Sequence, residues 1–152
     1  MALEVKHRAE GNAVALLDGR VLLFTRNGRL TSAALDAIEE LATSRARTAT
    51  AHEPVGALAI VNGDAGLSDN RLLERQRELL RSLKATPHLS FAFCVVGESV
   101  QAIAMRAVVR VFVLGSTGMR MVTEPSSAAQ WLAPRVGMEP GAILGALAEL
   151  PH

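Results

Sequence analysis

The segment at residues 55–69, VGALAIVNGDAGLSD, constrains the fold of this chain more than any other. Residues 55–61 are apolar apart from one glycine, and a strand without a polar face is typical of a parallel sheet covered by helices on both sides. The following NGDAG is rich in turn formers, and Ser68 lies where a helix N-cap is expected. Because functional residues gather at the carboxyl ends of strands in α/β sheets, we expect a site in this loop.

Further strands and helices flank this segment. Two apolar runs at residues 13–17 and 21–25 are joined through Asp18-Gly19, a dipeptide typical of a β-hairpin. Residues 1–11 are polar and charged, and they predict a polar arm or a short leading strand. The other expected elements are a helix capped by Thr31 or Ser32, a helix over 69–84, a strand at 89–96, a helix from residue 100, a strand at 119–123, a short helix from Pro125 and a last helix at 141–150.

The helix from residue 100 carries two arginines, Arg106 and Arg110, one turn apart. We expect both on its outer side, where with Arg120 they form a candidate anion or partner patch. The alternative is that their stems cover apolar surface and their charged heads stay in water. The residues expected to face inward are Val100, Ile103, Ala107, Val108 and Val111.

These elements predict an α/β fold with a mixed, mainly parallel sheet opened by a β-hairpin and with helices packed on it. The order is ββαβαβαβα, followed by an extra C-terminal helix within residues 137–152. The 152 residues fit one domain. The last helix, AILGALAEL, either packs back on the sheet or forms part of a homodimer or partner interface, which we favour slightly. Four methionines suggest the same adaptable apolar surface: Met105, Met119, Met121 and Met138.

Composition excludes several classes of protein. Charged residues make up 20% of the chain and its net charge is +1, so a nucleic-acid-coating or disordered chain is not expected. With no tyrosine and one tryptophan, stacking platforms for single-stranded nucleic acid are nearly absent. The single cysteine, Cys94, precludes an internal disulfide, and we expect it in the core. We find no secretion signal, no bilayer-length apolar segment and no metal-ligand spacing, and we expect a cytoplasmic protein without cofactor.

Three short motifs resemble the STAS fold, the SpoIIAA-like anti-sigma-factor antagonist domain. Gly28-Arg29-Leu30-Thr31 looks like the family's turn into its first helix, and residues 61–67 lie where the family carries an Asp-Ser-Ser/Thr-Gly-Leu loop. Residues 121–125, MVTEP, look like the family's final strand and the turn after it. With the order of elements, the resemblance covers roughly residues 12–133. It implies a non-enzymatic regulatory interaction module of bacterial-type signalling, with a kinase or regulator as partner.

The loop departs from the family at the residue that carries the family's switch. In that family a serine or threonine just before the loop glycine accepts phosphate from a kinase. Alignment on Gly66-Leu67 places Ala65 there, and the nearest hydroxyl belongs to Ser68. We therefore name Ser68 as the candidate phosphoacceptor, with its role as a simple helix cap as the alternative. The candidate partner-binding residues are Asp64, Gly66, Asp69, Arg71 and Arg75.

Two other motifs suggest chemistry. Ser99 follows Gly97-Glu98 at a strand-to-helix turn, as a hydrolase nucleophile does, but the second glycine is replaced by Gln101 and a helix cap explains it equally. The stretch at residues 115–118, GSTG, could bind phosphate, although it follows a helix, lacks the P-loop lysine and fits a helix C-cap. We name no catalytic residue, and a small apolar-ligand carrier with a pocket between sheet and helices remains the alternative function.

Overall fold

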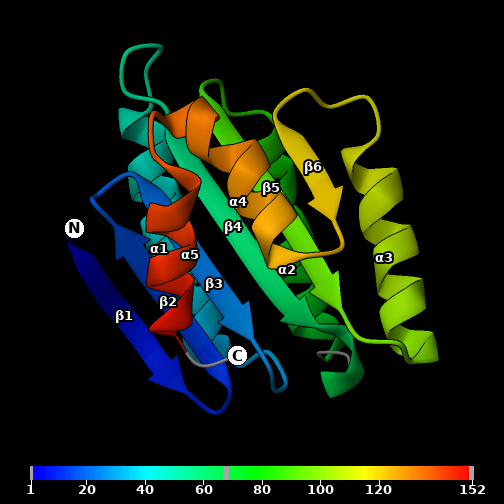
Figure 1. The fold of residues 1–152 in the computed structure, drawn as a ribbon. Helices are drawn as coiled ribbons and strands as arrows, with labels where there is room; N and C mark the ends of the chain where they lie inside the picture. The colour runs from blue at the N-terminus through cyan, green and yellow to red at the C-terminus, as the bar shows by residue number, and fades with distance from the viewer. Residues whose placement is uncertain (1, 67–68, 151–152) are drawn as a thin grey trace.

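The computed structural model describes residues 2–66 and 69–150 (Figure 1). One six-stranded sheet has the spatial order β1-β2-β3-β4-β5-β6, in which β1, β2 and β3 pair antiparallel and β3 to β6 pair parallel. The strands are β1 (Leu3–Ala9), β2 (Asn12–Leu17), β3 (Val21–Arg26), β4 (Val55–Asn62), β5 (Leu89–Val96) and β6 (Met119–Val122). The helices are α1 (Ser32–Thr48), α2 (Asn70–Lys84), α3 (Val100–Val113), α4 (Pro125–Leu132) and α5 (Pro140–Ala148), with short 3₁₀ turns η1 (Gly63–Ala65) and η2 (Ala133–Val136).

The α/β class, the mixed sheet and the order of elements confirm the sequence-based fold prediction. Of the two alternatives for the start of the chain, the leading strand forms, since residues 3–9 are strand β1 and not a polar arm. The predicted hairpin turn is present, because Asp18 and Gly19 both have positive φ, at 52° and 68°. Glu10 and Gly11 repeat this conformation between β1 and β2, and that second turn was not predicted.

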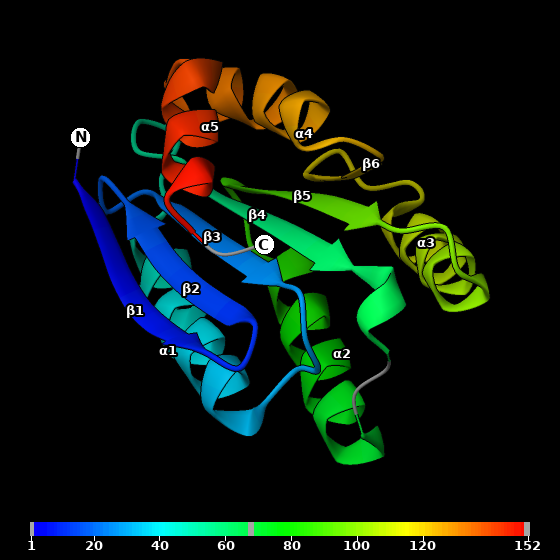
Figure 2. The same cartoon turned by 60° about the horizontal axis from the view of Figure 1, so that its bottom comes forward.

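Helices cover both faces of the sheet, as Figure 2 shows. One face is packed by α1, α2 and α3 and the other by α4, η2 and α5. Successive residues of β3 alternate between the two cores: Leu22 and Phe24 join the first, and Val21 and Leu23 join the second. Residues 55–61 are buried throughout, as expected for a strand with helices on both sides. Within the two described ranges, no helix combines the length and apolar character needed to cross a bilayer.

One predicted helix cap is wrong. Asp69, and not Ser68, caps α2, because its carboxylate accepts a hydrogen bond from the Leu72 amide at 2.9 Å. Ser68 itself lies outside the described residues. The last helix, for which partner contact was slightly favoured, packs back on the sheet and buries Ile143, Ala146 and Leu147. The N-cap of α1 is as predicted, since Thr31 accepts from the Ala34 amide at 3.2 Å.

Candidate functional site

The parallel strands β3, β4 and β5 end at the same edge of the sheet, and a buried arginine holds the loops there. Arg26, the last residue of β3, is 6% exposed. Its Nε donates to the Gly28 carbonyl at 2.9 Å, and its Nη2 donates to the Gly66 carbonyl. Burial lowers the pKa of this guanidinium. Arg26 therefore ties the loop after β4, which contains the predicted residue Gly66, to the end of β3.

Asn62 organises the first turn of the same loop. Its Nδ2 donates to Asn27 Oδ1 at 2.7 Å, across the gap between the ends of β3 and β4. Its Oδ1 accepts from the Asp64 amide at 3.0 Å and so caps η1. These two hydrogen bonds fix the turn and therefore the position of Asp64.

Asp64 connects this loop to the start of α3. Its Oδ1 accepts from the Ser99 amide at 2.9 Å, while the Ser99 hydroxyl caps α3 by accepting from the Ala102 amide at 3.1 Å. Hydrogen bonds from the Ser99 hydroxyl, and then from its amide, hold the pKa of Asp64 below its usual value. Gly97 lies so close that a Cβ added there would meet the Asp64 carboxylate at 2.7 Å. Asp64 is therefore a positioning residue for the N-terminus of α3.

Two of the other predicted partner-binding residues make contacts within the chain. Arg75 on α2 forms ion pairs with α1, to Asp36 at 2.6 Å and Glu39 at 3.0 Å. These two carboxylates raise the pKa of Arg75. Asp69 is used as a helix cap, and Arg71 is exposed without an ion pair or hydrogen bond among the residues that the structure describes. The α2 side of the proposed surface is thus largely engaged within the chain.

The predicted orientation of α3 is wrong. All five residues expected inward are exposed, and the face that packs on the sheet carries Ala102, Met105, Val109, Phe112 and Val113. The reason is Arg106, which was placed outside. Its Nη1 donates to the carbonyls of Val95 at 3.2 Å and Gly97 at 2.8 Å, so its side of the helix faces the end of β5.

This rotation leaves an apolar face of α3 in solvent. Within the described ranges, six large apolar side chains are exposed, and five of them lie on α3 or at its C-cap. They are between 58% and 81% exposed: Val100, Ile103, Val108, Val111 and Leu114. The helix stands at the edge of the sheet beside β6 (Figures 1 and 2). We call these five residues, with Ala104 and Ala107 between them, the α3 face.

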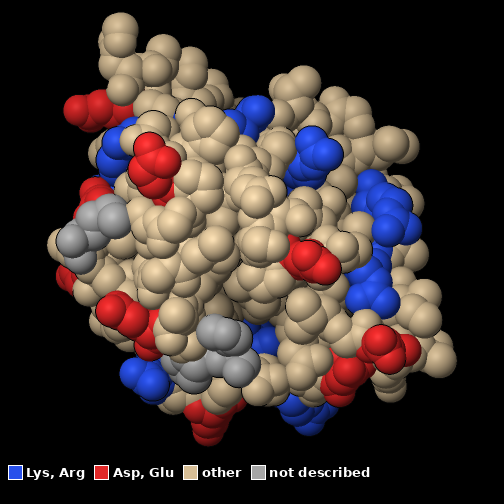
Figure 3. Space-filling model, in the orientation of Figure 1, with Lys and Arg blue, Asp and Glu red and all other residues tan. Residues whose placement is uncertain are grey.

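Charge is distributed unevenly around α3. In Figure 3, basic side chains gather over α3 and β6, and acidic ones lie near the N-terminal end of the helix. Arg106 donates its hydrogen bonds to carbonyls at the end of β5, so the predicted cluster of Arg106, Arg110 and Arg120 is only partly formed. Arg110 and Arg120 do come together, since both line a surface pocket of about 460 Å³.

The hydrogen bonds of both suggested motifs are those of helix ends. Among the described residues, the hydrogen bonds of Ser99 go to Asp64 and Ala102 and none goes to a histidine. In the GSTG stretch, Gly115 has a positive φ of 77° and the Ser116 amide bonds to the Val113 carbonyl at 3.0 Å, as in a helix C-terminus. Residues 2–66 and 69–150 contain no group of three potential ligands placed for a metal ion.

Surface pockets of ligand size lie in the described part of the chain, and an apolar-ligand carrier stays a prediction. The pocket of about 460 Å³ opens at the β6 edge, and a second of about 350 Å³ lies near the start of β5 with a mainly polar lining. No family model and no curated protein matches the sequence.

Sequence reasoning missed two contributors to this end of the molecule. In the sequence, Arg26 looks like an ordinary polar residue at the end of a strand. Its burial beneath two loops depends on the parallel register of β3 and β4. Trp131 was placed on a short helix but not in a pocket, because nothing local relates α4 to α3. The positive φ of 111° at Gly97 had a visible signal, a glycine at the end of a strand.

Proposed function

We propose that this protein is a non-enzymatic, regulatory protein–protein interaction module of the STAS type, and that its α3 face is the docking surface. One observation carries the proposal: five large apolar side chains stand in solvent along one helix. A contiguous apolar surface of this kind marks an interaction site more often than it marks free surface. Its spacing of three and four residues presents a continuous stripe to a partner.

The occupant that fits best is an amphipathic helix of a protein partner. Ala104 and Ala107 are exposed in the middle of the stripe, and small residues there let a second helix approach closely. Arg110 is the charged residue of α3 that borders this stripe, because Arg106 faces the end of β5. A second copy of the helix would bring a like charge to Arg110, whereas a partner with acidic residues beside its apolar stripe would complement it.

The resemblance to the STAS family supports a regulatory role for the loop after β4. Asp64 binds the first turn of α3 through Ser99, so a change of charge in residues 64–69 would act directly on the start of the docking helix. Ser68 remains the candidate phosphoacceptor of this loop. The surface proposed here therefore combines the loop with α3, in place of the loop with α2.

Site-specific photocrosslinking in the native host tests this proposal. A photoreactive amino acid replaces Val108 in the α3 face, and the control replaces Arg47, an exposed residue of α1. We expect one discrete protein adduct from position 108 that is absent from position 47. The captured protein is then purified and must bind the unmodified chain.

Three results would contradict the proposal. Equal adducts from both positions would indicate non-specific capture. A product of twice the chain mass would identify a second copy as the occupant. A captured protein that fails to bind in purified form would remove the partner assignment.

A further inference from the structure

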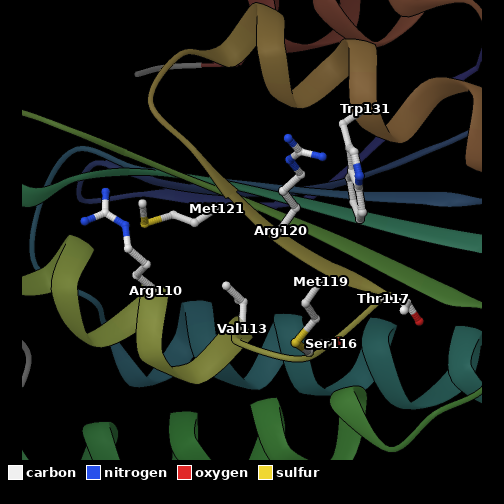
Figure 4. A pocket seen from close by; sticks show the side chains of 8 residues that line it. All are labelled: Arg110, Val113, Ser116, Thr117, Met119, Arg120, Met121 and Trp131. Carbon is white, nitrogen blue, oxygen red and sulfur yellow. The ribbon is translucent and has the colours of Figure 1, made fainter.

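The pocket at the edge of β6 lies between elements that are distant in sequence. It has a volume of about 460 Å³, within the range of small-molecule sites, and is open to solvent. Figure 4 shows that its walls come from α3, β6 and α4. It is separate from the α3 face, which none of its lining residues belongs to.

Two arginines give this pocket a positive charge. Arg110 extends from α3 and Arg120 from β6, and Figure 4 shows Arg120 beside Trp131 and Arg110 at the other end of the pocket, beside Met121. In the part of the chain that the structure describes, no acidic side chain lines the pocket. Among residues 2–66 and 69–150, neither guanidinium forms an ion pair or a hydrogen bond with the protein, so both retain their donors for a ligand.

Beside Ser116 and Thr117, the rest of the pocket is lined by apolar side chains and is partly fixed in place. Met119 and Met121 of β6 and Val113 of α3 supply aliphatic surface. The Trp131 ring lies under the Arg135 guanidinium, 4.6 Å from its centroid. Arg135 is itself held by the Ser90 hydroxyl at 2.9 Å and the Thr117 carbonyl at 2.8 Å, so this aromatic wall is preorganised.

We propose that this pocket binds a small organic anion that joins a carboxylate or phosphate to an aromatic or other flat apolar body. The anion lies between Arg110 and Arg120, whose planar guanidiniums suit bidentate contacts with such oxygens. The apolar body lies against Trp131 and the methionine side chains, which make favourable contacts with rings. Neither part alone uses the whole pocket. This inference does not depend on the proposed partner of the α3 face.

The single tryptophan makes the pocket directly observable by NMR. Because Trp131 is the only tryptophan, the protein has one indole N–H signal. Phenyl phosphate is the probe, with inorganic phosphate and benzyl alcohol as probes of charge and ring alone. We expect phenyl phosphate to shift this signal saturably with a Kd of about 1 mM or tighter. Inorganic phosphate lacks the ring and benzyl alcohol lacks the charge, so each should bind at least about tenfold more weakly than phenyl phosphate.

Substitutions distinguish the pocket from general ion binding. R110Q and R120Q should each weaken phenyl phosphate binding by about five- to tenfold, because each removes one charged contact. The matched control is R71Q, which removes the same charge from α2 and should leave the affinity unchanged. Both pocket arginines are exposed, so the variants are expected to fold, and the unperturbed amide spectrum checks this.

Three outcomes would overturn the proposal. The first is an indole signal that does not move at 10 mM phenyl phosphate. The second is an equal response to all three probes. The third is a folded R110Q or R120Q variant that binds phenyl phosphate as tightly as R71Q does.

Discussion

The contact between η1 and α3 predicts that Gly63 tolerates no side chain. Gly63 is buried, and a Cβ added there would lie 2.6 Å from both Cα and Cβ of Ala102, with Val95 at 3.3 Å. Real Cβ atoms do not approach this closely, and the Ala102 Cα and Cβ cannot move without the backbone of the helix. Gly63→Ala must therefore push the first turn of α3 away from the loop.

The size of the effect follows from overpacking. Inserting one methyl group into a closely packed contact costs about 1–3 kcal/mol. For a chain of about 150 residues, this corresponds to a fall in Tm of roughly 2–12 °C. Urea unfolding followed by circular dichroism measures the change in the free energy of unfolding, and Trp131 fluorescence provides a second probe of the same transition.

Gly145 provides a matched control. It is exposed within α5, and an added Cβ there meets nothing within 4 Å. Gly145→Ala should therefore raise the free energy of unfolding by about 0.5–1 kcal/mol, because glycine is unfavourable inside a helix. A Gly63→Ala variant as stable as the unmodified protein would refute the close contact between loop and helix. So would equal effects at the two positions.

Three further predictions concern titration and charge. The pKa of Asp64 is held below its usual value of 3.8, so the ionised carboxylate stabilises the fold fully above pH 3.8, and this stabilisation is lost as the pH falls further. Asp64→Asn removes the titrating group, so the urea midpoint of this variant should depend less on pH below about pH 4. Burial, and then the charge of Glu124, raises the pKa of Cys94 to about 11, so Ellman's reagent at pH 8 should modify it only in urea. Arg75→Gln removes exposed ion pairs and should lower the urea midpoint only slightly, with less effect at high salt.

The central strand and the hairpin could be predicted because their signals are local. An uncharged run at residues 55–61 and the dipeptide Asp18-Gly19 each have one favourable conformation. The cap at Thr31 is of the same kind. At α2, two adjacent residues, Ser68 and Asp69, could both cap, and local chemistry alone does not choose between them.

The orientation of α3 could not be predicted because its sequence is apolar on several sides. We expected the arginines to face solvent, and this expectation assigned the wrong face of α3 to the sheet. Arg106 instead satisfies two carbonyls at the end of β5, a use that depends on where the helix stands against the sheet. The pocket arginines were noticed in the sequence, but their meeting with Trp131 depends on the packing of α4 beside β6.

The most direct test of the docking surface is the affinity of the purified partner captured at α3 for two variants with the same added charge. Val108→Glu lies in the α3 face, and Thr43→Glu lies on the exposed side of α1. By isothermal titration calorimetry, we expect Val108→Glu to weaken binding at least about tenfold, as for a buried interface residue, and Thr43→Glu to leave it unchanged. Both variants should unfold within about 0.5 kcal/mol of the unmodified protein, because both sites are exposed. Undiminished binding by a folded Val108→Glu variant would contradict the assignment of α3 as the docking surface.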